Sequence, residues 1–443
     1  MNVMYPAIKN IVSGNRILVF LALAFCIVCY IRRSSNLPLV TTSDVGGYYA
    51  YLPAVFVHHD VHKLPDKWFE GQRKNEKGEV HTKYTCGVAF FYLPFFLIAH
   101  GYAHITGTDA SGYSPPYWLA LMLCGVFWSI VGLYLLKTIL LRHYGPLPTW
   151  LAVLAIALGT NFFNYASYEN GMSHIYSFTL FAATLLAADT YYKRPSQKLA
   201  ILLAVLLAWV VLIRPTNAVL GLFVLLYRIT TWTALKERLR FYAQHFRHFL
   251  FALPIALLVF VPQLLYWKEM TGHWLNYSYA GEHFIYWANP QIIKVLCDTR
   301  NGLFIYSPTL VFAVWALIAW RKDPRQSLAG TVLVFCIITY TFASWWAYWF
   351  GGAYGHRCYV EFYTIFAFPV ATTMEHTMQL RSKLAKGIIL FFLAFFCYYT
   401  IYFSEMYLTV TQFGGSEWEW NFDTWIKYVR RIIGLPPIHP PGH

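Results

Sequence analysis

Long apolar stretches separated by short polar segments run through most of the chain. Apolar runs of about 20 residues recur, and each is long enough to cross the hydrocarbon core of a bilayer as a helix. The pattern predicts an all-α polytopic membrane protein with about eleven transmembrane helices, forming a single transmembrane domain over residues 1–443. The predicted spans are 15–31, 117–141, 147–165, 171–191, 199–213, 216–230, 249–267, 303–320, 327–344, 358–375 and 387–404.

One apolar stretch is too long for a single crossing. A continuous helix over residues 199–230 would be roughly 48 Å long. Pro215 cannot donate the backbone hydrogen bond that a helix interior requires, so it breaks the helix. We therefore predict two helices that meet at a turn containing Arg214.

The orientation in the membrane depends on residues 86–105. This segment is apolar and long enough to span, but it contains a proline and two histidines. If it does not cross, the loops near 142, 193–198, 228–247, 321–325 and 381–386 carry 15 Lys and Arg residues, and the alternate internal loops near 166–170, 214, 268–302 and 345–357 carry 5. The positive-inside rule places the first set, with the N-terminus, in the cytoplasm. Arg32 and Arg33 oppose this orientation, but we predict that 86–105 lies in the outer leaflet.

The outer face then receives the loop 32–116 and the C-terminal tail 405–443. Residues 45–59 have the aromatic and apolar spacing of an interfacial helix, and the tryptophans and basic residues of the tail suit a second one. The apolar run near the N-terminus is followed by no clear cleavage site, so we expect a retained anchor.

Composition supports lipid as the main solvent. The chain is 58% hydrophobic and 12% charged, whereas a soluble domain usually carries about 25% charged residues. The net charge of +14 would suggest nucleic acid as a partner for a soluble protein, but here the basic residues lie in short loops. The eight cysteines indicate no disulfide framework.

The first candidate for chemistry is Asp44, which follows the first span and precedes two glycines and the aromatic pair Tyr48-Tyr49. A carboxylate at a membrane boundary is ordinarily a helix cap or a solvated loop residue. Further polar clusters are expected on the same side of the membrane, so we interpret Asp44 as an acid/base group.

Two more clusters follow in the central spans. Glu169 and His174 lie five residues apart at an outer junction, where they could share a substrate hydroxyl. The alternative is a capped helix start with a core histidine. An arginine at the break after residue 213 is costly unless it snorkels or is paired, and the guanidinium fork of Arg214 would match a lipid phosphate.

The last two clusters lie in the second half of the chain. Arg300 belongs to the polar turn Asp298–Gly302, which is either an ordinary turn or a second phosphate contact. Residues 345–357 interleave Trp346, Trp349 and other aromatics with three glycines and end in His356-Arg357. Aromatic girdles are common at membrane interfaces. Alternatively, the rings could hold a sugar or a prenyl chain, with Arg357 facing a departing phosphate.

These residues resemble the GT-C superfamily of integral-membrane glycosyltransferases, in particular the bacterial aminoarabinose transferase and protein mannosyltransferase-like enzymes. The likeness lies in Ser43–Tyr49 after the first helix, in Lys83-Tyr84-Thr85 before an apolar segment, and in Gly355-His356-Arg357. It implies a GT-C-like bundle of about eleven helices with juxtamembrane helices in the first outer loop.

The resemblance also implies a function. The donor would be a polyprenyl-phosphate sugar, the acceptor an envelope lipid, glycan or protein, and the location the bacterial inner membrane with a periplasmic active site. Asp44 would act on the acceptor hydroxyl, while Arg357, with Arg214 or Arg300, would stabilise the leaving phosphate. The substrate contacts would come from Tyr48, Tyr49, Glu169, His174, Trp346, Trp349 and His356.

Two features qualify the likeness. Many relatives carry paired acids in the first loop, whereas the next acid after Asp44 is Asp60, which puts a divalent metal cofactor in doubt without excluding it. A lipid-linked glycan transporter or flippase is the main alternative from another class. A transporter would carry polar or charged groups near the bilayer midplane. In this chain, ionisable residues such as Lys137 and Asp189 lie near predicted helix ends instead. An O-antigen polymerase or ligase, which uses pyrophosphate-linked donors, and a catalytically silent subunit are further alternatives.

Overall fold

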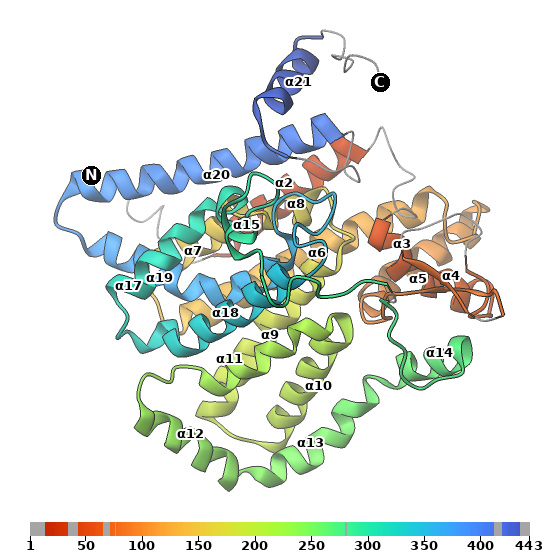
Figure 1. The fold of residues 1–443 in the computed structure, drawn as a ribbon, viewed down its shortest axis with the longest axis horizontal. Helices are drawn as coiled ribbons and strands as arrows, with labels where there is room; N and C mark the ends of the chain where they lie inside the picture. Colours follow the sequence, from red (N-terminus) through yellow and green to blue (C-terminus); the bar gives the residue numbers. More distant parts are fainter. Residues whose placement is uncertain are drawn as a thin grey trace. The chain divides into compact units, whose positions relative to one another are not determined.

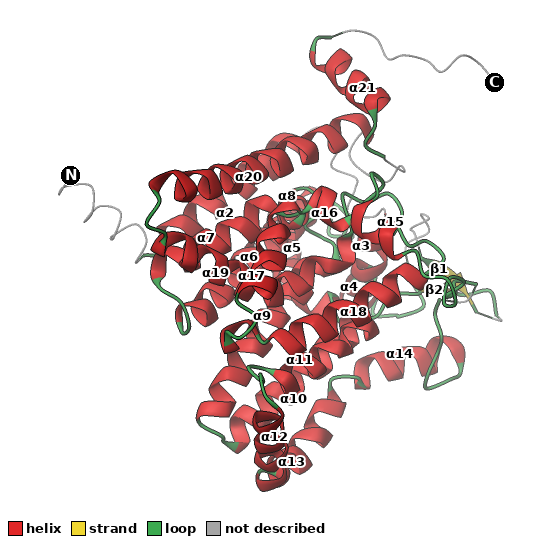
Figure 2. Cartoon of the chain, turned by 60° about the vertical axis from the view of Figure 1, so that its left-hand side comes forward, coloured by secondary structure: helices red, strands yellow, loops and turns green. Residues whose placement is uncertain are grey.

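The computed structural model describes residues 14–33, 43–64, 71–75, 77–279, 281–411 and 419–434. Regular structure in these residues is almost entirely helical (Figure 2). The sheet that they contain is a two-stranded antiparallel ribbon, in which β1 (Gln72–Lys74) pairs with β2 (Val80–Thr82). A mostly helical chain is therefore confirmed.

The chain divides into two compact units, each built from three separate segments. The first unit comprises Met1–Pro146, Tyr165–Glu282 and Lys322–Val334. The second comprises Leu147–Asn164, His283–Arg321 and Phe335–His443. The described helices that pass from one unit into the other are α7 (Pro146–Gly159), α8 (Phe162–Ser167) and α18 (Leu328–Ser344).

The first unit is organised around α9, a helix whose residues are mostly buried. It packs against α6 and α10, and α10 in turn packs against α13 (Figure 1). The helices of this unit are α2 (Arg16–Arg33), α3 (Ser43–Tyr49), α4 (Tyr51–Phe56), α5 (Ala89–Thr106), α6 (Pro115–Leu141), α9 (Ser173–Lys193), α10 (Gln197–Ile213), η2 (Pro215–Val219), α11 (Leu220–Leu226), α12 (Trp232–Gln244), α13 (Phe246–Leu258), α14 (Val261–Thr271) and η4 (Pro324–Gln326), where η denotes a 3₁₀ helix.

The predicted break before Pro215 is confirmed. Helix α10 ends at Ile213, and Arg214 has an extended backbone with φ −149° and ψ 117°. Pro215 then occupies the first position of η2, where its fixed φ is favourable and its missing N–H is not needed.

The second unit packs α17 against α19 and α20 against α21. Its core includes fully buried tyrosines such as Tyr306, Tyr354 and Tyr363. Its remaining helices are α15 (Ile292–Cys297), α16 (Leu303–Tyr306), η3 (Pro308–Leu310), α17 (Val311–Ala319), η5 (Arg357–Phe362), α19 (Tyr363–Gln379), α20 (Lys383–Thr411) and α21 (Phe422–Ile432).

Membrane-spanning capacity is clearest in four of the described helical segments. By length and composition, Pro115–Leu141, Phe246–Thr271, Pro324–Ser344 and Lys383–Thr411 could each cross a bilayer. Side chains such as Phe391 in α20 are apolar yet 65% exposed, as expected for a surface that faces lipid. These segments are compatible with a membrane protein, while the count of about eleven spans remains a prediction.

Candidate functional site

Asp44 lies in the first turn of α3 and is 8% exposed. The phenolic O–H of Tyr84 donates a hydrogen bond to Asp44 Oδ1. Burial, followed by the negative charge of Asp44, raises the pKa of Tyr84 well above its usual value. Tyr84 therefore stays protonated at physiological pH and acts as a fixed donor that orients the Asp44 carboxylate.

The Tyr84 ring is held in place by its close neighbours. The Thr82 hydroxyl donates to the Gly47 carbonyl at 3.1 Å and accepts from the Tyr84 N–H at 3.2 Å. A Cβ at Gly47 would lie 2.3 Å from Tyr84 Cδ2, and one at Gly71 would lie 2.5 Å from its Cε2. Two glycines thus leave the space that the ring occupies.

Tyr48 connects Asp44 to the start of α9. Its ring packs on that of Tyr84 with centroids 4.7 Å apart, and its O–H donates to Ser173 Oγ at 3.3 Å. Burial and the charge of Asp44 raise the pKa of Tyr48, and the positive charge of Arg214 opposes this shift. Asp44 and Arg214 are therefore both close enough to act electrostatically on one tyrosine.

Arg214 is anchored to α9. Its Nη1 lies 3.1 Å from Nδ1 and 3.2 Å from Nε2 of His174, which is 1% exposed. A guanidinium only donates, so the imidazole nitrogen that accepts carries no proton. Three residues along, Ser177 Oγ accepts from Asn217 Nδ2 at 3.2 Å. One face of α9 thus holds the turn between α10 and η2.

The segment after Tyr84 is joined to the end of α10. Thr85 Oγ1 donates to the Leu212 carbonyl at 2.5 Å, and Trp209 Nε1 donates to the Gly87 carbonyl at 2.9 Å. The Gly87 backbone lies close to Ile213, because a Cβ there would be 3.0 Å from the Ile213 nitrogen. These contacts tie the segment that follows Tyr84 to the end of α10, just before Arg214.

An ion-pair cluster flanks the group. Glu282 Oε1 accepts from Lys83 Nζ at 2.8 Å and from Arg73 Nη2 at 2.9 Å. Ser278 Oγ also donates to the Lys83 carbonyl at 2.6 Å. The loop before residue 283 is therefore fastened next to Tyr84, although no motif in the sequence pointed to Glu282.

The structure brings together Asp44, Tyr48, His174 and Arg214 in the first unit. Glu169 lies in the turn before α9 and is partly exposed, and its carbonyl accepts from the Met172 N–H at 3.0 Å. Tyr49 is different, since its O–H donates to the Gly112 carbonyl and its ring packs against Tyr92, Phe96 and Tyr113. We assign Tyr49 to loop packing rather than to substrate contact.

The residues predicted in the second half of the chain form a separate group within the second unit. The Arg300 guanidinium stacks on the Trp349 ring, 4.0 Å from its centroid. The next residue, Asn301, has φ 65°, and its Nδ2 donates to the Trp349 carbonyl at 2.9 Å while its Oδ1 accepts from the Gly355 N–H at 3.1 Å. The turn around Arg300 therefore closes the aromatic and glycine-rich loop.

The other residues of this loop differ in exposure. Trp346 is 42% exposed, and Arg357 is partly exposed at the start of η5. His356 is 1% exposed, lies 3.0 Å from the Tyr348 carbonyl through Nε2, and packs on Phe342. Its burial favours a role in shaping the loop over the predicted contact with substrate.

Tyr84→Phe tests the link between Tyr84 and Asp44. The variant keeps the ring but leaves a buried carboxylate without one donor, which costs about 1–3 kcal/mol. We expect a lower unfolding temperature for the purified protein, while Tyr102→Phe, at an exposed position in α5, should leave it unchanged. Equal unfolding temperatures for the Tyr84 variant and the parent would contradict the orienting role.

Gly47→Ala tests the packing around the same ring. The added methyl group meets Tyr84 Cδ2 and Thr82 Oγ1 at 2.3 and 2.9 Å, so the ring has to move, at a cost of about 1–3 kcal/mol in unfolding free energy. Gly101→Ala is the matched control, since a Cβ at that helical position meets nothing within 4 Å. Chemical denaturation should separate the two variants, and similar midpoints would refute the tight fit.

Among the residues that the structure describes, no three His, Cys, Asp or Glu side chains are grouped so that they could hold a metal ion. The residues around Asp44 are mainly tyrosines and an arginine, which are poor partners for a divalent cation.

No protein-family model matches the chain, and comparisons with curated proteins and with solved structures give no match. The functional assignment therefore depends on the residues and their geometry.

Proposed function

We propose that this protein is a membrane glycosyltransferase that moves a sugar from a polyprenyl-phosphate-linked donor to an acceptor of the cell envelope. The observation that carries the proposal is a buried carboxylate, Asp44, oriented by Tyr84, with Arg214 close enough for both charges to act on Tyr48. A base beside a fixed cation is what transfer of a sugar from a phosphate leaving group requires.

In the proposed reaction, an acceptor hydroxyl loses its proton to a carboxylate oxygen of Asp44. The hydroxyl oxygen forms a bond to the anomeric carbon of the sugar as the bond from that carbon to the phosphate oxygen breaks. The electron pair of the broken bond stays on the phosphate, so polyprenyl phosphate is the leaving group. A single displacement of this kind inverts the configuration at the anomeric carbon.

Arg214 would stabilise the negative charge that develops on the phosphate. His174 would position the Arg214 guanidinium. The phosphate contacts predicted for Arg300 and Arg357, and the substrate contacts predicted for Trp346 and Trp349, belong to the second unit and stay predictions from the sequence. Glu169 would hold a hydroxyl group of the substrate.

The proposed location follows from the distribution of basic loops. A cytoplasmic N-terminus places the loop that carries Asp44 on the outer face, which in a bacterial inner membrane is the periplasmic side. The partners would be the lipid-linked donor, an envelope acceptor and membrane lipid, and no nucleic acid is required. The GT-C-like architecture is part of the same proposal.

The direct test is a transfer assay with the purified full-length protein in detergent. A pool of polyprenyl-phosphate sugars, labelled in the sugar, is supplied with an envelope lipid and glycan extract. Mass spectrometry should show the labelled sugar on an acceptor and free polyprenyl phosphate as a product.

The same materials separate the alternatives. Movement of a labelled lipid-linked glycan across proteoliposomes, without transfer, would indicate a transporter or flippase. Release of polyprenyl pyrophosphate would indicate a polymerase or ligase. Either result would overturn the proposed donor chemistry.

A further inference from the structure

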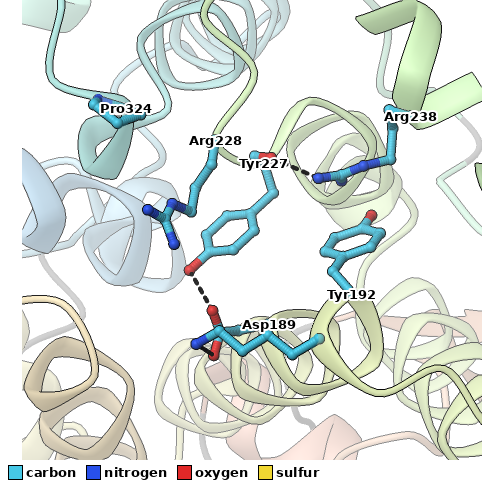
Figure 3. Close-up of a pocket in the computed structure, with 7 residues that line it drawn as sticks. Asp189, Tyr192, Tyr227, Arg228, Arg238 and Pro324 are labelled. Atoms are coloured by element: carbon cyan, nitrogen blue, oxygen red, sulfur yellow. Dashed lines mark hydrogen bonds and ion pairs between the residues drawn. The ribbon is translucent and has the colours of Figure 1, made fainter. Parts of the chain in front are cut away.

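A second polar site lies at the other end of α9. The Asp44 group contacts the helix at Ser173, whereas a cavity of about 310 Å³ opens beside Asp189 and Lys193 at its C-terminal end (Figure 3). A helix of 21 residues rises about 30 Å, close to the thickness of a hydrocarbon core. The cavity therefore lies one membrane thickness away from Asp44, on the predicted cytoplasmic side.

The acidic side chain among the cavity-lining residues is already neutralised. Asp189 accepts from Arg142 at 2.7 Å and from Lys193 at 2.9 Å, and its other oxygen lies 3.1 Å from His143 Nε2. The O–H of Tyr227 donates to that second oxygen at 3.3 Å. Asp189 thus has little capacity left to balance the other charges of the cavity.

Arg238 supplies a rigid cation to the cavity wall. Its guanidinium stacks on the Tyr192 ring at 3.5 Å from the centroid. Its Nη1 donates to the carbonyls of Val224 and Leu225 at 3.5 and 3.4 Å, and its Nη2 donates to the Tyr227 carbonyl at 3.1 Å. Neutral carbonyls and an aromatic face fix the side chain without cancelling its charge. The positive charge therefore remains available to an anion.

Arg228 has an uncommon backbone conformation. It has φ 59°, and its N–H donates to Ser327 Oγ at 2.9 Å, where Ser327 itself has φ 50°. Arg228 and Ser327 are therefore in contact, and each has a left-handed backbone conformation that costs a non-glycine residue conformational free energy. Within the described part of the chain, no hydrogen bond or ion pair holds the Arg228 guanidinium, which lies beside the Tyr227 ring (Figure 3) and lines the cavity.

The outer side of α12 favours a membrane surface as the environment. Trp232 and Leu239 are 71% and 52% exposed, and Lys236 and Arg240 are exposed with them. A helix that exposes both large apolar and basic side chains is suited to the interface of an anionic membrane. The cavity lies behind this helix, on the side that carries Arg238.

We propose that this cavity binds a phosphate ester, held by Arg228, Lys193 and Arg238. Guanidinium groups match phosphate oxygens with paired hydrogen bonds, and basic pockets on the cytoplasmic side of membrane proteins suit phosphorylated head groups. The cavity is larger than a phosphate group alone, so it leaves room for the organic group to which the phosphate is bonded. The chemistry is shared by an anionic phospholipid and by a soluble phosphate compound.

The test uses the full-length protein in neutral detergent and measures binding by native mass spectrometry. Phosphatidylglycerol, glycerol 3-phosphate and the phosphate-free lipid diacylglycerol are the three probes. We expect phosphatidylglycerol or glycerol 3-phosphate to bind, and Arg228→Gln to weaken that binding about tenfold, as for the loss of one charge-assisted contact. Binding of the lipid alone identifies a head-group site, and binding of glycerol 3-phosphate identifies a site for the phosphate ester itself.

Arg240→Gln is the matched control, because Arg240 is exposed on α12 and does not line the cavity. It should bind the probes as the parent does. Lys193→Gln gives a second measurement that leaves the Arg228 backbone untouched, and it should weaken the same probe. Equal losses in the Arg228 and Arg240 variants, equal binding of diacylglycerol, or no binding of either phosphate probe by the parent would overturn the proposal. None of these outcomes depends on sugar transfer.

Discussion

Asp44→Asn is expected to abolish the proposed sugar transfer while leaving the fold and binding of the proposed donor largely intact. The amide has nearly the same shape and still accepts the Tyr84 hydrogen bond through its oxygen, but it cannot take a proton from the acceptor. Loss of a general base typically lowers kcat by about 10²–10⁴-fold. Initial rates in the transfer assay, with donor binding measured separately, give the result.

Asp60→Asn is the control for this experiment, because Asp60 lies in the same loop and accepts from the His62 N–H at 3.0 Å. Its rate should stay within about twofold of the parent, as for most changes at surface positions. An Asp44→Asn enzyme that works at the parental rate would remove Asp44 from the base role. Loss of both transfer and folding in that variant would instead assign Asp44 a structural role.

Arg214→Gln is expected to lower kcat/KM for the lipid-linked donor by about 10–100-fold, the equivalent of one charged hydrogen bond. The glutamine keeps hydrogen-bonding capacity toward His174 but removes the positive charge that acts on Tyr48. Because the charge is proposed to act on the leaving phosphate, the effect should appear in kcat as well as in KM.

His174→Ala provides an internal comparison, because it keeps the charge of Arg214 and removes one of its anchors. We expect a smaller loss than for Arg214→Gln, and combining the two changes should cost less than the sum of their separate effects. Arg321→Gln, at an exposed position, controls for the change in net charge. Unaltered donor kinetics in Arg214→Gln would rule out the proposed phosphate contact.

Much of the helical framework could be predicted because apolar run length is a strong signal. The predicted spans 117–141, 199–213 and 327–344 lie within two residues of α6, α10 and α18. The break at Pro215 followed from length and from the missing N–H of proline. Local chemistry alone was sufficient at these places.

Other predicted spans are interrupted by tertiary contacts that local patterns do not report. Residues 147–165 contain a break between α7 and α8, where the Asn161 N–H donates to Ser307 Oγ at 3.1 Å and Asn161 Oδ1 accepts from the Tyr363 O–H at 2.5 Å. Both partners are more than 140 residues away in the sequence. An apolar window cannot indicate which distant hydroxyl will replace a helical hydrogen bond.

In the candidate site, too, some residues could be predicted from local sequence and others could not. Asp44, Tyr48 and Arg214 were recognisable as polar groups at predicted boundaries. The importance of Tyr84 as the partner of Asp44 was not, because the motif containing it suggested only a family likeness. The packing contacts of Tyr49 and His356 could not be predicted either, because alternation of aromatic and glycine residues gives no measure of burial.

The slot around Tyr84 has a consequence for sequence variation. A side chain at position 47 or 71 would push the Tyr84 ring out of its present position. A descendant of this sequence that enlarges either glycine would therefore displace or replace Tyr84, and would weaken the donor to Asp44 at the same step. The three positions should covary as one inherited unit, and a divergent chain that retains the carboxylate should retain all of them.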